Sequence, residues 1–349
     1  NNSGCFFFIF LVVTTIPGGP SEKVGLKAGD RIIEVDGENI AGTGLKNSDV
    51  FELLRGKKGT PVEIQVLRRG NDGKLDFKII RDKIPINSLD ASYMIDDATG
   101  YIKLRRFSAT TTDEFTQAMQ ELKEQKIQNL ILDLRGNGGG YLKTAIEISD
   151  QFLEDDKLVV YTNGENEPTR KYNATSSGVF ENGNLVVLID ESSASASEIV
   201  SGAVQDWDRG LIIGRRSYGK GLVQKPYFLT DGSVVRLTTA HYYTPSGRCI
   251  QKPYGEGVED YRHDYIDRLN TGELFSKDSI DFADSLQYKT LVNGRTVFGG
   301  GGVMPDIFVP MDTSSHFRYY NRLSRNNIIY NFVLDYVDKN REKLEKNYR

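Results

Sequence analysis

Residues 185–198, LVVLIDESSASASE, join a fully apolar run to a serine-rich segment that opens a helical pattern. Residues 130–140, LILDLRGNGGG, repeat this arrangement, because an apolar run leads directly into a glycine-rich loop and an amphipathic helix follows. Short apolar runs bounded by loop residues are typical of buried strands. Strands that alternate with helices in this way predict an α/β domain that carries its functional residues at the strand ends.

The serine run and the segment YGKG at 218–221 supply a candidate nucleophile, Ser195, and a candidate base, Lys220. A serine attacks an amide only when a base removes its proton, and no histidine lies in either motif. An ordinary lysine is almost wholly charged at neutral pH and cannot act as a base. Burial in an apolar site favours the neutral amine, so we expect Lys220 to be buried.

Each of these motifs also has a simpler explanation. Serines at a helix start commonly cap backbone amides, and a lysine between glycines commonly lies in a solvated turn. The loop at 135–140 lacks the Gly-Lys-Ser/Thr ending of a phosphate-binding loop and the full dinucleotide fingerprint. A glycine loop can instead direct bare amides at a developing oxyanion. His241, His263 and His316 lie outside the motifs, and no zinc-site spacing is present.

Together, the motifs resemble the C-terminal processing (tail-specific) proteases, a family of Ser/Lys serine peptidases. The matching segments are DLRGNGGG at 133–140, SASASE at 193–198, YGKG at 218–221, DGS at 231–233, TPSGR at 244–248 and VMPD at 303–306. The resemblance implies that Ser195 is the nucleophile, that Lys220 is the base and that Gln224 completes the site. It also implies a mixed α/β (α+β) fold with a crotonase/ClpP-like protease domain. Tyr218 replaces the usual Phe of the family, and Ser192 stands where Gly often precedes the serine run.

The same resemblance implies an endopeptidase that cleaves unfolded or C-terminally exposed polypeptides. The amide of Ala196 and that of Gly138 or Gly139 are expected to form the oxyanion hole, because a developing negative charge needs preorganised donors. No metal or organic cofactor is implied. Two alternatives remain open: a peptide-binding scaffold on the same fold that does not cleave, and an acyl-CoA enzyme of the crotonase type, which would not need the Ser/Lys pair.

The N-terminal region resembles a PDZ domain of the bacterial protease type, most clearly over residues 18–37. A PDZ domain adds the C-terminus of a peptide as an extra strand and holds its carboxylate on loop amides. That loop is expected at Gly4, Cys5, Phe6 and Phe7. The pattern predicts strands at 12–16, 31–35 and 62–68, a helix from about 47, a boundary at 83–86 and a terminal helix from about 327. We therefore expect a PDZ-like domain, complete or not, at 1–82 and a protease domain with a C-terminal helical tail at 83–349.

The composition is typical of a soluble protein that does not bind nucleic acid, because the net charge is −4 and no dense basic cluster is present. The apolar run at 6–13 is too short to span a bilayer and lacks the charged start of a signal peptide, so we expect a buried strand there. The family resemblance implies an exported bacterial protein of the periplasm or cell envelope, whose signal peptide is not among these residues. The expected partners are polypeptides with exposed C-termini, with no nucleic acid and no lipid. A homo-oligomer is compatible with this reading.

Overall fold

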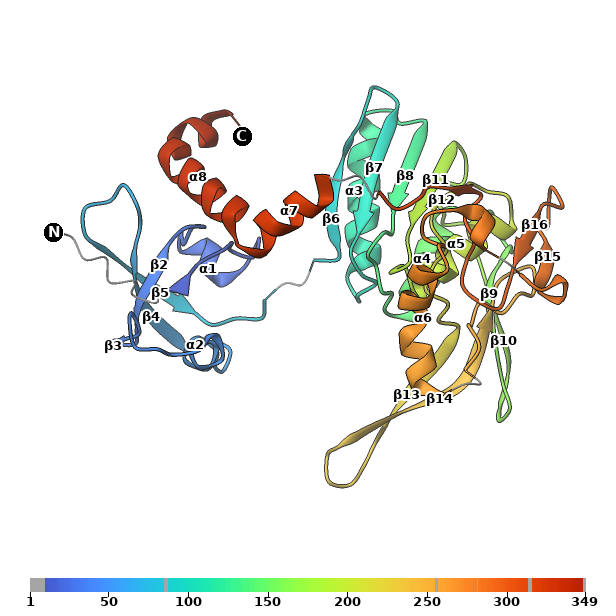
Figure 1. Cartoon of the computed structure of the whole chain (residues 1–349), viewed down its shortest axis with the longest axis horizontal. Coiled ribbons are helices and arrows are strands. Elements are labelled where there is room, and N and C mark those ends of the chain that lie inside the picture. Colours follow the sequence, from blue (N-terminus) through green and yellow to red (C-terminus); the bar gives the residue numbers. More distant parts are fainter. Residues whose placement is uncertain (1–9, 85–86, 255–256, 281, 313–315, 348–349) are drawn as a thin grey trace. The chain divides into compact units, whose positions relative to one another are not determined.

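The structure is a computed structural model that describes residues 10–84, 87–254, 257–280, 282–312 and 316–347 (Figure 1). The chain divides into two compact units. One unit comprises residues 1–86 together with 313–349, and the other comprises residues 87–312. Each unit has its own hydrophobic core.

The smaller unit contains a five-stranded antiparallel sheet with the order β1-β2-β4-β5, in which β3 pairs with β2. Its elements before residue 84 are β1 (Phe10–Leu11), α1 (Pro20–Lys23), β2 (Arg31–Val35), β3 (Glu38–Asn39), α2 (Asn47–Leu54), β4 (Pro61–Leu67) and β5 (Lys74–Ile80). Asp36 and Gly37 join β2 to β3, and both have the positive φ that a tight hairpin requires (47° and 84°). Alternate residues of β4, namely Val62, Ile64 and Val66, are buried in the core.

Two strands of the smaller unit differ from the predictions. The strand predicted at 12–16 is wrong, because β1 ends at Leu11 and Val13 and Ile16 are exposed beyond it. Strand β5 follows the turn at 69–73 and was not predicted, since most of its side chains are only partly buried and its apolar alternation is weak. The predicted carboxylate loop at Gly4, Cys5, Phe6 and Phe7, like most of the apolar run at 6–13, lies outside the described residues.

The C-terminal residues belong to the smaller unit. They form two helices, α7 (His316–Arg325) and α8 (Ile328–Asn347). Arg341 Nη2 donates to the carbonyl of Ala28 at 2.8 Å, and Arg69 forms an ion pair with Asp335. The sequence had instead grouped this tail, as one helix from about 327, with the protease domain. These two contacts join residues that are far apart in the sequence, with separations of 266 positions for Arg69–Asp335 and 313 positions for Arg341–Ala28. They assign the tail to the smaller unit, and helical periodicity does not reveal such contacts.

The larger unit is built on a six-stranded sheet with the order β17-β12-β11-β8-β7-β6. Neighbouring strands are parallel except for β6, which is antiparallel to β7. The elements of this layer are β6 (Leu89–Met94), β7 (Thr99–Leu104), α3 (Thr111–Glu124), β8 (Asn129–Asp133), α4 (Leu142–Asp150), β11 (Asn184–Ile189), α5 (Ala196–Asp206), β12 (Leu211–Gly214) and β17 (Ile307–Phe308). The glycine loop (residues 135–140) follows β8, and the serine turn (residues 190–195) follows β11. Because β8 and β11 are parallel neighbours, the loop and the turn leave the same edge of the sheet (Figure 1). The mixed α/β fold predicted from the sequence is confirmed.

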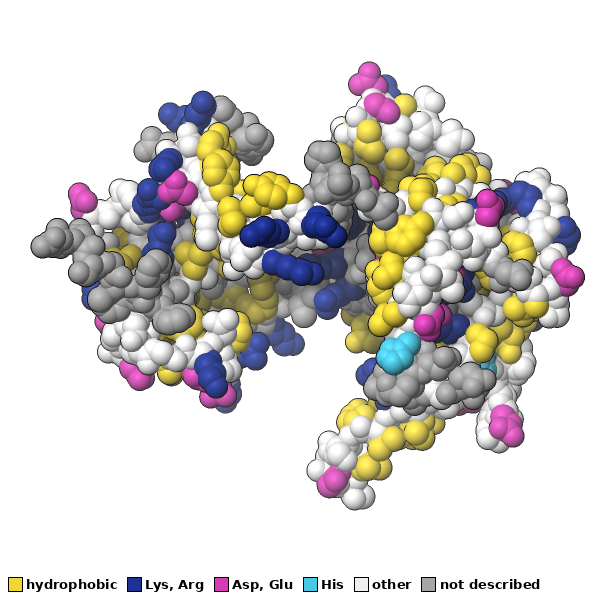
Figure 2. Space-filling model, viewed as in Figure 1, with side chains coloured by type: hydrophobic (Ala, Val, Ile, Leu, Met, Phe, Trp, Pro, Cys, Tyr) yellow, Lys and Arg dark blue, Asp and Glu magenta, His cyan; other side chains and the backbone are white. Residues whose placement is uncertain are grey.

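A second, antiparallel sheet of the larger unit has the order β10-β9-β14-β13. Its strands are β9 (Leu158–Gly164), β10 (Glu167–Asn173), β13 (Leu222–Phe228) and β14 (Val234–Tyr243). Strand β13 lies at the edge of this sheet and begins two residues after Lys220. The far end of the β13–β14 hairpin projects from the unit, and Figure 2 shows hydrophobic side chains along it (Figures 1 and 2).

The rest of the larger unit follows β14. It comprises α6 (Val258–Asn270), the 3₁₀ helices η1 (Lys277–Ser279) and η2 (Asp284–Leu286), and the hairpin of β15 (Gln287–Lys289) and β16 (Thr296–Phe298). Within the part of the chain that the structure describes, no helix is both long enough and apolar enough to cross a bilayer.

Candidate active site

Ser195 lies at the turn between β11 and α5 in a conformation that L-residues rarely adopt. Its φ is 55° and its ψ is −110°, and such strain persists only where the surroundings impose it. A strained strand-to-helix turn of this kind exposes a nucleophilic side chain. The neighbouring Ser193 and Ser197 are buried, and their hydroxyls donate to the carbonyls of Leu134 and Asn137, each at 2.8 Å. Of these three serines, Ser195 is the one that lines a cleft.

The cleft at Ser195 has a volume of about 670 Å³ and is formed by the glycine loop, the serine turn and the β13–β14 hairpin. The site residues that the sequence predicted in the larger unit all line it: Ser195, Lys220, Gln224, Gly138, Gly139 and Ala196. Segments that are up to 86 positions apart in the chain, between Gly138 and Gln224, are thus brought together. One surface therefore offers a hydroxyl, an amine and free backbone amides.

The glycine loop lies directly against the serine turn. A Cβ on Gly139 would come within 2.8 Å of Ser195 Cβ, so only glycine fits at this position. The Gly139 amide donates to Asn137 Oδ1 at 2.9 Å and is already satisfied within the loop. Among the hydrogen bonds of the described residues, none uses the amide of Gly138 or of Ala196. Of the alternatives left open by the sequence, the pair Gly138 and Ala196 is therefore the one with free donors.

Lys220 is half-buried, so the prediction that it is buried is wrong. Its backbone, in contrast, is firmly held within the lysine segment, residues 217–220. The Lys220 amide donates to Glu198 Oε2 at 2.9 Å, and its carbonyl accepts a hydrogen bond from the Tyr242 hydroxyl. Among the interactions of the described residues, none joins Lys220 Nζ to Ser195 Oγ. The side chain stays accessible because it lies where two hollows of the surface adjoin.

Gln224 is exposed on β13 and lines the same cleft as Lys220. No hydrogen bond of the described residues joins the two side chains, so the orienting role of Gln224 stays a prediction.

Tyr242, on β14, lines the same cleft as the two predicted catalytic residues. Its hydroxyl donates to the carbonyl of Lys220. Burial raises the pKa of Tyr242 well above its ordinary value, so its hydroxyl keeps its proton at neutral pH. No sequence motif marks this contact, because Tyr242 is one of several apolar residues of an ordinary strand pattern.

Glu198 is a fully buried carboxylate that holds both the serine turn and the lysine segment. Its Oε2 accepts from the amides of Ser195 and Lys220 at 2.7 and 2.9 Å. Its Oε1 accepts from the Ser217 hydroxyl and the Gly219 amide, each at 2.6 Å. Burial raises the pKa of Glu198, and these hydrogen bonds act in the opposite direction. The signal that could have identified it is the Ser-x-x-Glu capping pattern at the start of α5.

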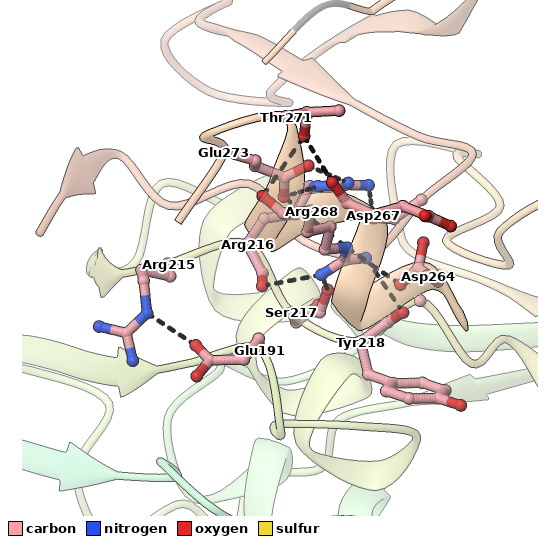
Figure 3. Close-up of polar contacts among 12 residues, drawn as sticks. Glu191, Arg215, Arg216, Ser217, Tyr218, Asp264, Asp267, Arg268, Thr271 and Glu273 are labelled. Atoms are coloured by element: carbon pink, nitrogen blue, oxygen red, sulfur yellow. Dashed lines mark hydrogen bonds and ion pairs between the residues drawn. The ribbon is translucent and has the colours of Figure 1, made fainter. Parts of the chain in front are cut away.

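Arg268 of α6 also holds the lysine segment (Figure 3). Its Nη1 donates to the carbonyl of Ser217 at 2.8 Å, and its Nη2 donates to that of Tyr218 at 3.3 Å. The carboxylates of Asp264 and Glu273 lie 3.0 and 3.7 Å from Arg268 Nε and balance its charge. Burial lowers the pKa of Arg268, but a guanidinium remains charged in proteins. The amides of the lysine segment are thus held by a buried carboxylate and its carbonyls by a buried guanidinium.

Replacing Arg268 with methionine should lower kcat for peptide cleavage by roughly 10- to 100-fold with little change in KM. The reason is that a displacement of about 1 Å in a catalytic group can cost about 100-fold in rate. Arg268→Lys should recover part of the rate, because an ammonium can reach one of the two carbonyls. Steady-state kinetics on a short peptide measure both parameters.

The matched control is Arg209→Met. Arg209 likewise donates to backbone carbonyls, those of Phe152, Gly183 and Phe180, but it does not line the cleft. This control should lose thermal stability and keep its kcat. Equal losses of kcat in both variants would show that Arg268 acts on stability alone.

Three family models match separate parts of the chain. The model described as peptidase family S41 matches residues 98–260, and a PDZ domain model matches residues 11–68. A third model, described as a family of unknown function (DUF8443), matches residues 319–349. The first match covers the glycine loop, the serine turn and the lysine segment, and the third covers most of α7 and α8.

Curated relatives agree with these models. The carboxy-terminal-processing protease of Bartonella bacilliformis is 38% identical over 244 residues, which are 69% of this chain and 55% of the relative. The carboxy-terminal processing protease CtpB of Bacillus subtilis is 35% identical over 251 residues, which are 71% of this chain and 51% of the relative. A solved photosystem II D1 C-terminal processing protease has 30% identity and a TM-score of 0.47, and the match covers 86% of this chain and 68% of that structure.

The chain thus spans about half the length of the curated relatives it matches. The family resemblance predicted from the sequence is confirmed: the chain belongs to peptidase family S41 and is similar to its carboxy-terminal processing proteases.

Proposed function

We propose that this chain is a serine endopeptidase that cleaves unfolded or C-terminally exposed polypeptides with a Ser/Lys dyad. The observation that carries the proposal is the strained turn at Ser195, which shares one cleft with Lys220 and with the free amides of Gly138 and Ala196. The printed names of the relatives, which are carboxy-terminal processing proteases, support the same activity.

In the proposed reaction, Ser195 Oγ attacks the carbonyl carbon of the scissile peptide while the neutral amine of Lys220 takes the hydroxyl proton. The carbonyl oxygen becomes negative and accepts from the amides of Gly138 and Ala196, each worth roughly 3–4 kcal/mol in comparable sites. The C–N bond then breaks, and Lys220 returns the proton to the leaving amine. Water attacks the resulting ester by the same route, which releases the second product and restores the Ser195 hydroxyl.

The arrangement described above fits a resting form that a bound polypeptide converts into the active one. Ser195 and Lys220 share the cleft without a mutual hydrogen bond, and the Tyr242 hydroxyl donates to the backbone carbonyl of Lys220. A polypeptide along the cleft would displace water from around Lys220. Exclusion of water favours the neutral amine that the reaction needs.

The direct test is to incubate the full chain with a permanently unfolded protein, such as reduced and carboxymethylated casein. The wild type should produce fragments with time, and Ser195→Ala should produce none while giving the same circular dichroism spectrum. The missing Ser195–Lys220 hydrogen bond also favours a second candidate, a peptide-binding scaffold that does not cleave. That candidate is correct if both proteins bind the casein equally and neither cleaves it.

The smaller unit provides a groove suited to the C-terminal tail of a substrate. The groove has a volume of about 790 Å³, lies between β1 and α2, and has a largely apolar lining that includes Phe10, Val12, Val50 and Phe51. Strand β1 is an edge strand, so its free side can pair with an extended tail in the way that PDZ domains bind peptides. We therefore assign the reading of exposed C-termini to this groove. We also propose that the protein acts in the periplasm or cell envelope of a bacterium, as its family resemblance implies.

Replacing Phe51 with serine should weaken the preference for a free apolar C-terminus by roughly 3- to 10-fold. Phe51 is on α2, lines the groove and is 53% exposed, so the change removes apolar contact area without opening the core. The measurement is the ratio of kcat/KM for one substrate with a free carboxylate to that for the same substrate amidated. Ile80→Ser, on β5 outside the groove and 51% exposed, is the control that should keep the ratio. An unchanged ratio in Phe51→Ser would exclude this groove as the tail-binding site.

A further inference from the structure

The cleft at Ser195 contains a second cationic side chain, Arg236, which takes no part in the proposed cleavage reaction. Arg236 lies on β14 directly opposite Pro226 of β13, and both residues line the cleft. It is exposed, and among the interactions of the described residues it makes no hydrogen bond and no ion pair. Its guanidinium therefore has its donors free for a ligand.

The charge of the cleft suits an anion. Its lining includes Lys220 and Arg236 and no aspartate or glutamate. A guanidinium presents two parallel N–H groups that match the two oxygens of a carboxylate. Because no carboxylate of the lining competes for Arg236, an acidic group on a bound polypeptide would meet an unpaired cation.

The β14 register sets the distance between Arg236 and the reacting groups. Arg236 and Tyr242 are six positions apart on β14 (242 − 236), with a β-bulge between Thr238 and Ala240, and both line the cleft together with Ser195. Six residues of a strand span about 20 Å. An extended arginine side chain covers roughly a third of this distance, so about four residues of an extended peptide fill the rest.

Strand β13 has a free edge with which an extended substrate peptide could pair. It is the edge strand of its sheet and runs from the lysine segment to a point beyond Pro226, which faces Arg236. The unpaired side of an edge strand accepts another chain in an extended conformation. A polypeptide added to β13 would therefore pass both the Ser195 hydroxyl and the Arg236 guanidinium.

We propose that Arg236 binds a carboxylate of the polypeptide substrate that lies about four residues from the scissile bond. The proposal rests on the proposed function. The carboxylate is either the α-carboxylate of the substrate's C-terminus or the side chain of an aspartate or glutamate; both have the same chemistry. Arg236 would then determine which peptide bond is cleaved, because it favours the bond that lies about four residues from a carboxylate of the substrate.

The experiment uses the full chain and a set of peptides with one scissile sequence. In the first arm, a free C-terminal carboxylate is placed two, four, six or eight residues after the scissile bond, with amidated peptides as neutral partners. In the second arm, all peptides are amidated. Each acidic peptide carries one glutamate two, four, six or eight residues after or before the scissile bond, and its neutral partner carries glutamine at the same position. The readout is the ratio of kcat/KM for the acidic peptide to that for its neutral partner.

The wild type should show a ratio of roughly 3 to 10 that peaks at a spacing of about four, in the range expected for an accessible arginine–carboxylate pair. Arg236→Ala should bring the ratio to about 1, and Arg236→Glu should reverse it. The ratio should also fall between 0.05 and 0.5 M salt because of screening. Arg170→Ala removes an exposed arginine of β10 outside the cleft and should keep the wild-type ratio. The arm that shows the peak identifies the source of the carboxylate.

A ratio of about 1 in the wild type at every spacing would overturn the proposal, as would an unchanged ratio in Arg236→Ala. The failure of the proposed function is a separate outcome, because then the neutral peptides also remain intact. In that case, fluorescence anisotropy of the labelled peptides on Ser195→Ala and on Ser195→Ala/Arg236→Ala decides the question. A spacing-dependent preference for the acidic peptides that the second substitution abolishes would support the carboxylate site, and equal affinities would overturn it.

Discussion

Lys220→Arg should abolish peptide cleavage, with a fall in kcat of about 10⁴-fold or more. Arginine keeps the positive charge and the length of the side chain, but its guanidinium cannot lose a proton at any pH that the protein survives. Lys220→Ala and Ser195→Ala should each give a loss of similar size, and the double variant should be no worse, because residues that act as one unit are not additive. The measurement is single-turnover cleavage of a labelled peptide.

The matched control for Lys220→Arg is Lys225→Arg. Lys225 lies five positions further along the chain, on β13, and pairs with Glu167, outside the cleft. Arginine can form the same ion pair, so this variant should keep its kcat within about twofold, as is usual for surface pairs. Cleavage by Lys220→Arg at more than one tenth of the wild-type rate would remove the lysine from the role of base. The hydroxyl of Tyr242, which lines the same cleft as Ser195, would then be the next group to test.

The helices and strands that could be predicted from the sequence are those whose buried apolar residues recur at a regular spacing or in an unbroken run. Helix α3 is an example, because Phe115, Ala118, Met119 and Leu122 recur at helical spacing and are all buried. The same holds for β8 and β11, whose apolar runs are too regular to be loops. Strands β5, β6 and β10 were missed because few of their residues are buried. Their strand conformation depends on pairing with a neighbour, which a local pattern does not encode.

The residues of the candidate site likewise fall into those that sequence motifs identify and those that only the fold brings to the site. Motifs with a fixed order identified Ser195 and Lys220, because the glycine loop, the serine turn and the lysine segment each carry their own signature. Arg268, which holds the lysine segment, has no such signature, because it reaches the Ser217 carbonyl across 51 positions of sequence. The burial of Lys220 was overestimated for a related reason. Its exposure depends on how the hairpin borders the cleft, and no single segment of sequence records that.

The second large effect is expected for Glu198, whose two oxygens accept four hydrogen bonds from the serine turn and the lysine segment. Glutamine has the same shape, but its NH₂ group would face two donors whichever way it turned. At least one backbone amide would lose its acceptor, and an unsatisfied buried donor costs about 1–3 kcal/mol. Glu198→Gln should therefore lower the free energy of unfolding by about that amount and kcat by roughly 100-fold, since both reacting groups lose a shared support.

Glu114→Gln separates the catalytic effect of Glu198 from its effect on stability. Glu114 Oε2 likewise accepts three hydrogen bonds, from the amide and hydroxyl of Ser88 and from the amide of Leu89, at 2.8 to 2.9 Å, but it does not line the cleft. Both variants should therefore unfold at lower urea concentrations than the wild type. In conditions where both are fully folded, kcat should fall only in Glu198→Gln, with KM nearly unchanged. If Glu198→Gln keeps its kcat there, the four hydrogen bonds stabilise the fold without setting the positions of Ser195 and Lys220.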